Sequence, residues 1–538
     1  MQWTSQQEKV IQSRKRNLLV SAAAGSGKTA VLVERIVRMI TDPKNPVDLD
    51  RLLVMTFTSA AAGEMRERVG KAIEEKLAAE PGNRRLSLQA ALVPHAQIQT
   101  IDSFCLSLIR SHYASLDIDP AFRVGDEGEL TLLKNDVMME LFEDKYEEGS
   151  PEFVRFVETY GGGRTDMGIE EAVDQVYRFS VSHPWPMEWL SRCQEEFQEG
   201  ELKRFQEKEW VQFLIRDVKL IMEEYLQQMD QAIAICQEPD GPASYLPVLL
   251  QEREMIADAA SAGEFEALMK KLQALSFGRL APARKKEIDP EKKEYVAAVR
   301  DRVKKGAIKC RDRYASQTME EIRESMAGCS PAAKTLLELT GEFIKRYQQA
   351  KRERNLVDFG DLEHFAIQVL YTEGKPSAVA DRLALGYEEI LVDEYQDSNQ
   401  VQETLIYALS RERFGKPDVF MVGDMKQSIY RFRQARPELF LEKYQTYSLE
   451  EGPFQKIELQ KNFRSRHQVL DTVNAFFYRL MGSRLGGIAY SRENALYPAG
   501  SFGEVPAEQD NRTELFLLDT GKLSFRKISA AAIRYWTR

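Results

Sequence analysis

Cysteine and histidine are scarce in this sequence of 538 residues, which contains five of each. No two cysteines have the C-x-x-C spacing typical of zinc and redox sites, and an odd number does not suit a disulfide framework. The histidines are equally scattered. These features argue against a zinc or iron–sulfur centre and predict reduced cysteines that pack in the protein core.

Long hydrophobic runs are also missing. A membrane-spanning helix needs about 18 consecutive apolar residues, and no window of the sequence provides them. One apolar run, residues 18–24, follows three basic residues and loosely resembles a signal peptide. It is short, and the letters GSGK at residues 25–28 interrupt it, so we interpret it as a strand that enters a loop. We expect a cytoplasmic protein without a membrane partner.

The sequence has no excess of positive charge. It contains 74 Lys and Arg against 84 Asp and Glu, which gives a net charge of −10. Net acidity argues against indiscriminate binding of polyanions but allows a local basic channel. Residues 270–313 are locally basic, and two interpretations stay open for them: a solvated helix face or a nucleic-acid contact.

The chain is too long for a single hydrophobic core, so we expect several domains. Apolar strand signals at residues 17–21, 52–56 and 97–100 alternate with helical periodicity at 29–41, from 59 and at 103–113. The helix from Ser59 has Ala61, Met65 and Val69 on one face. Repeated strand–helix units indicate a parallel sheet covered on both faces.

Helical periodicity dominates from about residue 119 to 355. Strand signals then return at residues 389–392 and 419–422, and a further α/β segment begins near Phe454. This organisation predicts one sheet domain that carries a large helical insertion and is followed by another α/β piece.

A candidate phosphate loop lies between the first strand and the following helix. It consists of Ala22, Ala23, Ala24, Gly25, Ser26, Gly27, Lys28 and Thr29. In such loops the backbone N–H groups and the helix N-terminus bind phosphates, the lysine reaches the β and γ oxygens, and the hydroxyl binds Mg²⁺. The strict pattern begins with glycine where this sequence has Ala22, and a purely structural turn is the alternative.

A second acidic site supports this interpretation. The apolar stretch at residues 390–392 ends in Asp393 and Glu394. We expect Asp393 to contact Mg²⁺ and Glu394 to accept a proton from the water that attacks the γ-phosphate of ATP. The alternative is that these carboxylates only cap a helix.

The order of motifs resembles that of superfamily 1 DNA helicases of the UvrD, Rep and PcrA type. The matching segments are WTSQQ (3–7), the phosphate loop, TFTSAA (56–61), TIDSF (100–104), DEYQD (393–397), GDMKQSIYRFR (423–433) and LQKNFRS (459–465). Within that superfamily the sequence is most similar to the AddA (RexA) subunit of bacterial AddAB helicase–nucleases. That similarity lies in DIDPAFRV (117–124), DFGDL (358–362) and the residues after NFRS (462–465).

The resemblance implies roles for four residues around the nucleotide. Gln7 would read the edge of adenine, and Phe463 would stack on it. Arg464 would contact the γ-phosphate, reaching the site with Phe463 from a second lobe. Gln427 would sense the γ-phosphate and relay its loss to the DNA.

The resemblance also implies contacts with single-stranded DNA. Phe57 and Phe432 would present aromatic rings to the bases, with stacking worth about 1–3 kcal/mol each. Arg433 would bind a phosphate or base nearby, and Thr58 and Ser103 would meet the DNA backbone. Core packing is the alternative for the two rings, and helix capping is the alternative for Thr58 and Ser103.

Several features depart from the family pattern. Ala30 stands where arginine often follows the phosphate-loop threonine, and Asp102 stands where histidine is common. Motifs V and VI and the AddA nuclease domain have no counterpart, and residues 521–538 do not continue the pattern. We therefore expect a truncated N-terminal part of a longer protein.

The implied fold is an α/β P-loop NTPase (RecA-like) core with a helical insertion, plus an incomplete second RecA-like domain. We assign residues 1–117 and 356–436 to the first core domain, 118–355 to the insertion and 437–538 to the start of the second core domain. The implied function is ATP- and Mg²⁺-dependent 3′→5′ translocation on single-stranded DNA, in a heterodimer with an AddB (RexB) partner that repairs double-strand breaks by recombination.

Other interpretations remain open. One is a generic P-loop kinase or signalling NTPase. The motifs around Gln7, Gln427 and Arg464 argue against it, because such a protein would not need them. Further alternatives are a catalytically weak DNA- and ATP-binding fragment and a UvrD-like repair helicase without a nuclease.

Overall fold

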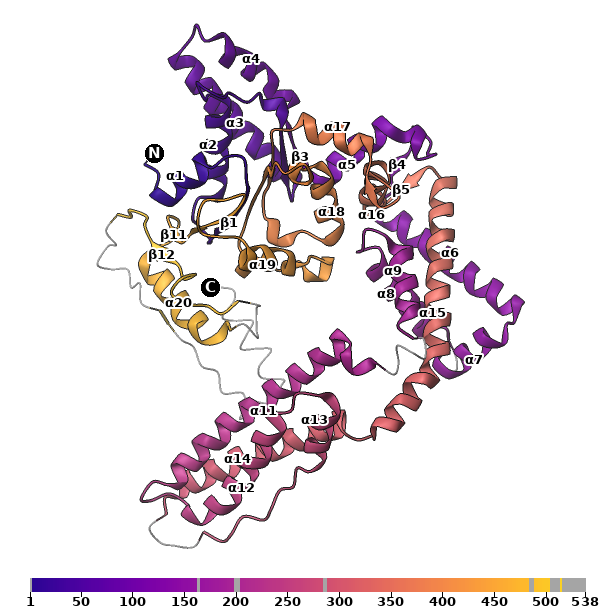
Figure 1. Ribbon diagram of the computed structural model, residues 1–538, viewed down its shortest axis with the longest axis vertical. Coiled ribbons are helices and arrows are strands. Elements are labelled where there is room, and N and C mark those ends of the chain that lie inside the picture. The colour runs from indigo at the N-terminus through magenta and orange to yellow at the C-terminus, as the bar shows by residue number, and fades with distance from the viewer. Residues whose placement is uncertain are drawn as a thin grey trace, which may run out of the picture. The chain divides into compact units, whose positions relative to one another are not determined.

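The computed structural model describes residues 2–161, 165–197, 204–283, 288–482, 488–503 and 513–514. The chain forms two compact units (Figure 1). The first comprises Met1–Thr131, Val181–Pro184 and Ala350–Arg538, and the second comprises Leu132–Ser180 and Trp185–Gln349.

A six-stranded sheet organises the first unit. Its strands are β1 (Asn17–Ala22), β2 (Leu52–Thr56), β3 (Gln97–Thr100), β8 (Glu389–Val392), β9 (Val419–Gly423) and β10 (Phe454–Leu459). The spatial order is β10-β1-β9-β8-β2-β3, and every neighbouring pair is parallel. The predicted parallel sheet is therefore confirmed. Its inner strands are almost wholly buried, as their continuous apolar sequences require.

Helices and short strands complete this unit. The helices are α1 (Ser5–Gln12), α2 (Lys28–Ile40), α3 (Ser59–Ala79), α4 (Arg84–Leu92), α5 (Ile101–His112), α16 (Phe359–Leu370), α17 (Ala378–Gly386), α18 (Gln400–Leu409), α19 (Pro437–Thr446) and α20 (His467–Leu480). The short strands are β4 (Arg123–Val124), β5 (Leu356–Val357), β6 (Tyr371–Thr372), β7 (Lys375–Pro376), β11 (Lys461–Asn462) and β12 (Tyr497–Pro498). On α3, Met65 and Val69 are buried as expected, but Ala62 rather than Ala61 joins them.

A buried ion pair fixes α1 and α2 against the sheet. Arg35 of α2 contacts both carboxylate oxygens of Glu389 on β8, at 2.6 and 2.7 Å. The same guanidinium donates to the carbonyl of Val10 on α1 at 2.5 Å. Because a buried charge without a partner is costly, these three elements depend on one another.

The strand expected to open a second domain belongs to the first sheet. β10 pairs with β1 in parallel from Phe454 to Leu459, so this strand joins the first sheet although it lies after the boundary assigned at Arg436. Its residues alternate between buried and partly exposed positions, as on a half-covered edge strand. Such a pattern shows that a strand exists but not which sheet it joins.

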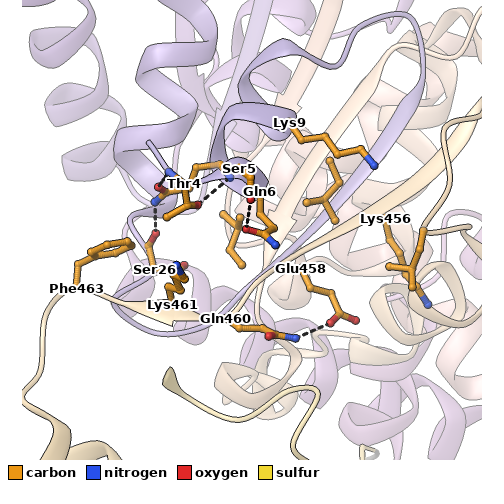
Figure 2. Close-up of a pocket in the computed structure, with 14 residues that line it drawn as sticks. Thr4, Ser5, Gln6, Lys9, Ser26, Lys456, Glu458, Gln460, Lys461 and Phe463 are labelled. Atoms are coloured by element: carbon orange, nitrogen blue, oxygen red, sulfur yellow. Dashed lines mark hydrogen bonds between the residues drawn. The ribbon is translucent and has the colours of Figure 1, made fainter. Parts of the chain in front are cut away.

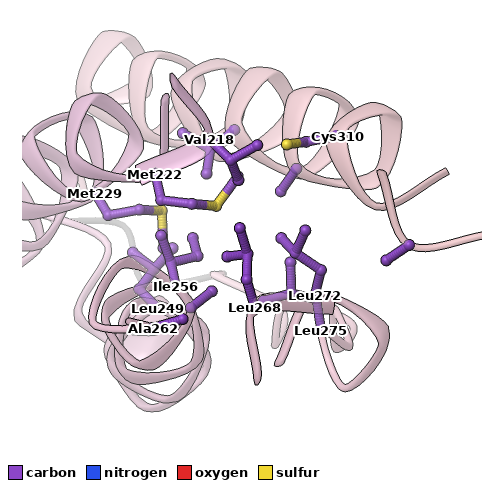
Figure 3. Packing of buried hydrophobic residues seen from close by; sticks show 14 of the residues in the cluster. Val218, Met222, Met229, Leu249, Ile256, Ala262, Leu268, Leu272, Leu275 and Cys310 are labelled. Atoms are coloured by element: carbon purple, nitrogen blue, oxygen red, sulfur yellow. The ribbon is translucent and has the colours of Figure 1, made fainter. Parts of the chain in front are cut away.

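The second unit is helical, as predicted. Its helices are α6 (Glu127–Glu148), α7 (Pro151–Tyr160), α8 (Met167–Ser180), α9 (Pro186–Glu195), α11 (Glu209–Cys236), α12 (Leu246–Ala260), α13 (Phe265–Gln273), α14 (Pro290–Tyr314) and α15 (Met319–Glu353), of which α6 and α15 extend into the first unit. Figure 3 shows the apolar core between α11, α12, α13 and α14, which includes Met222, Leu249 and Leu272.

The prediction of reduced cysteines in the protein core is confirmed for some of them and wrong for one. All five cysteines are free, and Cys105, Cys236 and Cys310 are buried, but Cys329 is exposed and does not fit the predicted core position.

In the basic stretch at residues 270–313, Arg300 is buried against Glu252. Arg284, Lys285 and Lys286 lie outside the described residues. Arg302 and Lys309 are exposed, so a solvated helix face and a nucleic-acid contact both stay open for them.

Across the described ranges, none of the helices has both the length and the apolar composition that crossing a membrane requires.

Candidate nucleotide and DNA site

The phosphate loop lies between the end of β1 and the start of α2. Gly25 and Gly27 have φ values of +71° and +82°, which side chains other than glycine rarely tolerate. Ala22 is the last residue of β1 and is buried, so this position needs no glycine conformation. This explains the departure from the strict pattern.

Ser26 supports the interpretation of this loop as a phosphate site. The residue is 1% exposed, and its Oγ has no hydrogen-bond partner among the described residues. Buried polar atoms are nearly always hydrogen-bonded in native proteins. A hydroxyl without a partner inside a loop of this kind fits a bound phosphate.

Lys28 and the two acids meet beside this loop. The Nζ of Lys28 lies 2.8 and 2.7 Å from the two carboxylate oxygens of Glu394. Burial, reinforced by the neighbouring charge of Glu394, raises the pKa of Asp393 to about 6. Asp393 and Thr29, the second residue of α2, offer the oxygen ligands that Mg²⁺ prefers. Glu394 has φ +48°, a left-handed conformation that is uncommon for this residue type.

Gln7 joins helix α1 to the phosphate loop. Its Oε1 accepts from the backbone N–H of Thr4 at 3.0 Å, and its Nε2 donates to the carbonyl of Ser26 at 3.0 Å. A carboxamide has two N–H groups and two lone pairs, so one of each stays available for adenine.

A cavity of about 410 Å³ lies beside Gln7 and Ser26. Figure 2 shows it between α1 and the segment around β10, with Lys456, Glu458 and Gln460 around it. Phe463 also lines the cavity and is 38% exposed, as an aromatic ring that stacks on a ligand must be. Its position is compatible with the predicted contact to the nucleotide base.

The segment with Phe463 and Arg464 is attached to the phosphate loop itself. The backbone N–H of Phe463 donates to the carbonyl of Gly25 at 2.9 Å. The Nδ2 of Asn462 donates to the carbonyl of Ala24 at 2.6 Å, and its Oδ1 accepts from the N–H of Arg464 at 2.9 Å. Sequence reasoning assigned no role to Asn462, because its partner in the loop lies more than 400 positions away.

Gln427 lies just beyond the end of β9. Its Nε2 donates to the Oδ2 of Asp424 at 2.7 Å, and Lys426 forms an ion pair with the same carboxylate at 2.9 Å. Asp424 therefore holds the side chain that the sequence predicts to sense the γ-phosphate.

Aromatic rings gather around the predicted DNA contacts. Phe57, which follows β2, lies 4.9 Å from the ring of Tyr430, and Tyr430 lies 5.9 Å from Phe432. The guanidinium of Arg433 is 5.5 Å from the Tyr430 ring and 5.7 Å from the Phe432 ring. Phe432 is 75% exposed, which excludes core packing for this ring. Sequence reasoning gave Tyr430 no role, although it links the other two rings.

Thr58 and Ser103 differ in their local contacts. The Oγ1 of Thr58 accepts from the backbone N–H of Ala61, so Thr58 is the N-cap of α3. The N-cap of α5 is Thr100, and the Ser103 hydroxyl lies 2.8 Å from its Oγ1. The capping alternative thus holds for Thr58 and is wrong for Ser103.

A second cavity, of about 200 Å³, adjoins both groups of residues. Phe57, Thr58 and Arg433 line it together with Asp393 and Glu394. Asp102 also lines it, and burial raises the pKa of this carboxyl. The predicted nucleotide and DNA residues therefore border a common space at the carboxyl ends of β2, β3 and β8.

The fold and the site define an α/β protein with a phosphate loop at the carboxyl edge of a parallel sheet. Residues 3–448 match the family model for the UvrD/REP helicase N-terminal domain, so the chain belongs to this family.

Curated relatives agree with this membership. The chain is 46% identical over 534 residues to a protein of Lachnoclostridium phytofermentans, covering 96% of this chain and 39% of the relative. It is 43% identical over 510 residues to one of Clostridium beijerinckii, covering 93% and 41%. It is 41% identical over 528 residues to one of Bacillus licheniformis, covering 96% and 42%. The names of all three describe a subunit of an ATP-dependent helicase/nuclease, which confirms the predicted similarity to AddA. The chain spans about two fifths of the length of these relatives.

Proposed function

We propose that this chain is the ATP-hydrolysing motor part of a DNA helicase subunit that moves 3′→5′ along single-stranded DNA. The whole protein would act with an AddB (RexB) type partner in a helicase/nuclease that processes double-strand breaks for recombinational repair. The observation that carries the proposal is the pairing of Lys28 with Glu394 beside the phosphate loop, next to Asp393. This arrangement supports the proposal that a cation, a metal ligand and a proton acceptor act together here.

Each residue has one task in this proposal. Lys28 neutralises charge on the β and γ phosphates, and Arg464 adds a second cation from the segment that Asn462 attaches to the loop. Thr29 and Asp393 hold Mg²⁺, which when bound would neutralise charge on the phosphate oxygens. Glu394 accepts the proton of the attacking water.

In this proposal the adenine base and the DNA bind to different groups of residues. Gln7 and Phe463 bind adenine in the 410 Å³ cavity. The DNA contacts are Phe57, Phe432, Arg433, Thr58 and Ser103. Gln427 would report the loss of the γ-phosphate to the DNA contacts, because it follows β9 on the same stretch as Phe432.

The finer domain assignment also belongs to this proposal. The six-stranded sheet is a RecA-like core domain built from residues 1–117 and the chain after 355, and residues 118–355 are its insertion. The strand β10 extends this core to Leu459. A second RecA-like domain would begin after it.

Glu394→Gln is expected to keep Mg·ATP binding and to block hydrolysis, because the amide no longer accepts a proton. Asp393→Asn is expected to weaken metal dependence and nucleotide affinity together. Fluorescent-nucleotide titration and single-turnover hydrolysis of radiolabelled ATP measure both effects. Glu74→Gln, on the exposed face of α3, is the matched control. Equal nucleotide binding by the Asp393 and Glu394 variants would contradict this division of tasks.

Phe432→Ala is expected to weaken binding of single-stranded DNA by about 1–3 kcal/mol, because an exposed ring that stacks on a base is lost. The melting temperature should stay unchanged, since the ring is 75% exposed. Phe414→Ala is the control, because Phe414 is an exposed phenylalanine outside the predicted DNA contacts. A lower melting temperature without a DNA effect would refute the stacking role.

A further inference from the structure

Gln396 is a buried amide that contacts the proposed proton acceptor. It lies in the short turn after β8 and is 1% exposed. Its Nε2 donates to the Oε2 of Glu394 at 2.9 Å and to the Oδ2 of Asp397 at 3.1 Å. Its Oε1 accepts from the backbone N–H of Asp424 at 2.9 Å. Both N–H groups and the oxygen are thus engaged, which fixes the orientation of the carboxamide.

The glycine at the end of β9 makes room for this amide. A Cβ at Gly423 would lie 2.2 Å from the Oε1 of Gln396, so any other residue here would push the amide out of this position. Gly423 has no positive φ, so close approach is the reason for glycine here. The next residue, Asp424, holds Gln427 through its carboxylate. A continuous path of contacts therefore leads from Glu394 through Gln396 and Asp424 to Gln427.

The position of Glu394 depends on few donors. Among the described side chains, Lys28 and Gln396 are the two that donate to its carboxylate. Under the proposed function Lys28 also serves the phosphates of the nucleotide, so its hold on Glu394 weakens when nucleotide binds. Gln396 then becomes the main donor that orients a carboxylate whose backbone is already in an uncommon conformation.

We propose that Gln396 is a positioning residue for hydrolysis, which orients Glu394 and links it to the segment that carries Gln427. The inference rests on the proposed function, because it assumes that Glu394 is the proton acceptor. The competing interpretation is that Gln396 only satisfies buried polar groups.

Two substitutions separate these interpretations. Gln396→Glu keeps the size of the side chain and an oxygen for the N–H of Asp424, but it replaces the donor to Glu394 with a repelling acceptor. Gln396→Leu removes both interactions and leaves the buried N–H of Asp424 unpaired, which is expected to lower the melting temperature. Gln400→Glu is the matched control, because the Oε1 of Gln400 accepts from Arg436 instead.

The measurements are the single-turnover rate of hydrolysis of radiolabelled ATP and the affinity for a fluorescent ATP analogue, both on the 538-residue chain. Gln396→Glu is expected to slow hydrolysis about 10²-fold, the typical cost of a misplaced catalytic group, with an affinity within about twofold of wild type. A purely structural role would instead lower the rate, the affinity and the melting temperature together, and that result would overturn the inference.

Glu394→Gln in the same assay distinguishes a failure of the positioning role of Gln396 from a failure of the proposed function. Loss of hydrolysis in Glu394→Gln with a wild-type rate in Gln396→Glu would overturn the positioning role and leave the proposed function standing. A wild-type rate in Glu394→Gln would overturn the proposed function itself.

Discussion

Replacing Lys28 with alanine is expected to abolish ATP hydrolysis while leaving the binding of single-stranded DNA intact. Lys28 is the first residue of α2, and under the proposed function it is the cation that contacts the β and γ phosphates. An arginine finger on a transferring phosphoryl group is worth about 10³–10⁵ in rate, and we expect the loss of the Lys28 cation to be of similar size. The proposed DNA contacts around Phe432 belong to other segments and should bind as before.

The resting structure adds a second consequence of this substitution. Lys28 neutralises Glu394, so its removal leaves that carboxylate with Gln396 as its donor among the described side chains. The measurement is single-turnover hydrolysis together with a titration of a fluorescent oligonucleotide. Lys44→Ala, on an exposed segment after α2, is the control. Hydrolysis by Lys28→Ala at the wild-type rate would disprove the phosphate-loop assignment.

Local sequence was sufficient to predict the strands around the candidate site and the glycine-containing turn between β1 and α2. A strand, two glycines, Lys28 and a helix follow one another directly, so their geometry depends on neighbouring residues. The position of the two acids after β8 was predictable for a different reason. Parallel strands place their carboxyl ends at one edge of the sheet, so residues that follow β1 and β8 lie near one another. The predicted strands at residues 17–21 and 389–392 correspond to β1 and β8.

Contacts between distant segments could not be predicted from the sequence. The alternation in β10 is compatible with an edge strand of any sheet, and only its register with β1 assigns it to the first. Asn462 and Gln396 are ordinary polar residues in the sequence, and they become informative through bonds to Ala24 and Asp424. The capping alternative considered for Ser103 was wrong because Thr100, three positions earlier, provides the cap of α5.

The 538-residue chain is expected to bind nucleotide weakly and to separate DNA strands poorly or not at all beside the full-length L. phytofermentans relative. The resemblance implies that hydrolysis also needs an arginine from motif VI, which has no counterpart in these residues. An arginine of that kind is worth about 10³–10⁵ in rate, so its loss outweighs the contacts of Lys28 and Arg464. The slow hydrolysis that remains is what the single-turnover comparisons above measure.

The surface of α20 supports the same expectation. Phe476, Tyr478 and Leu480 are 49%, 44% and 60% exposed, an apolar group that soluble proteins usually cover. We therefore expect the chain to aggregate more readily than the longer relative. Steady-state DNA-stimulated hydrolysis and strand separation, measured on both proteins at equal concentration, test whether the chain is less active than the longer relative. Strand separation by the 538-residue chain at the rate of the relative would show that these residues suffice for a complete motor.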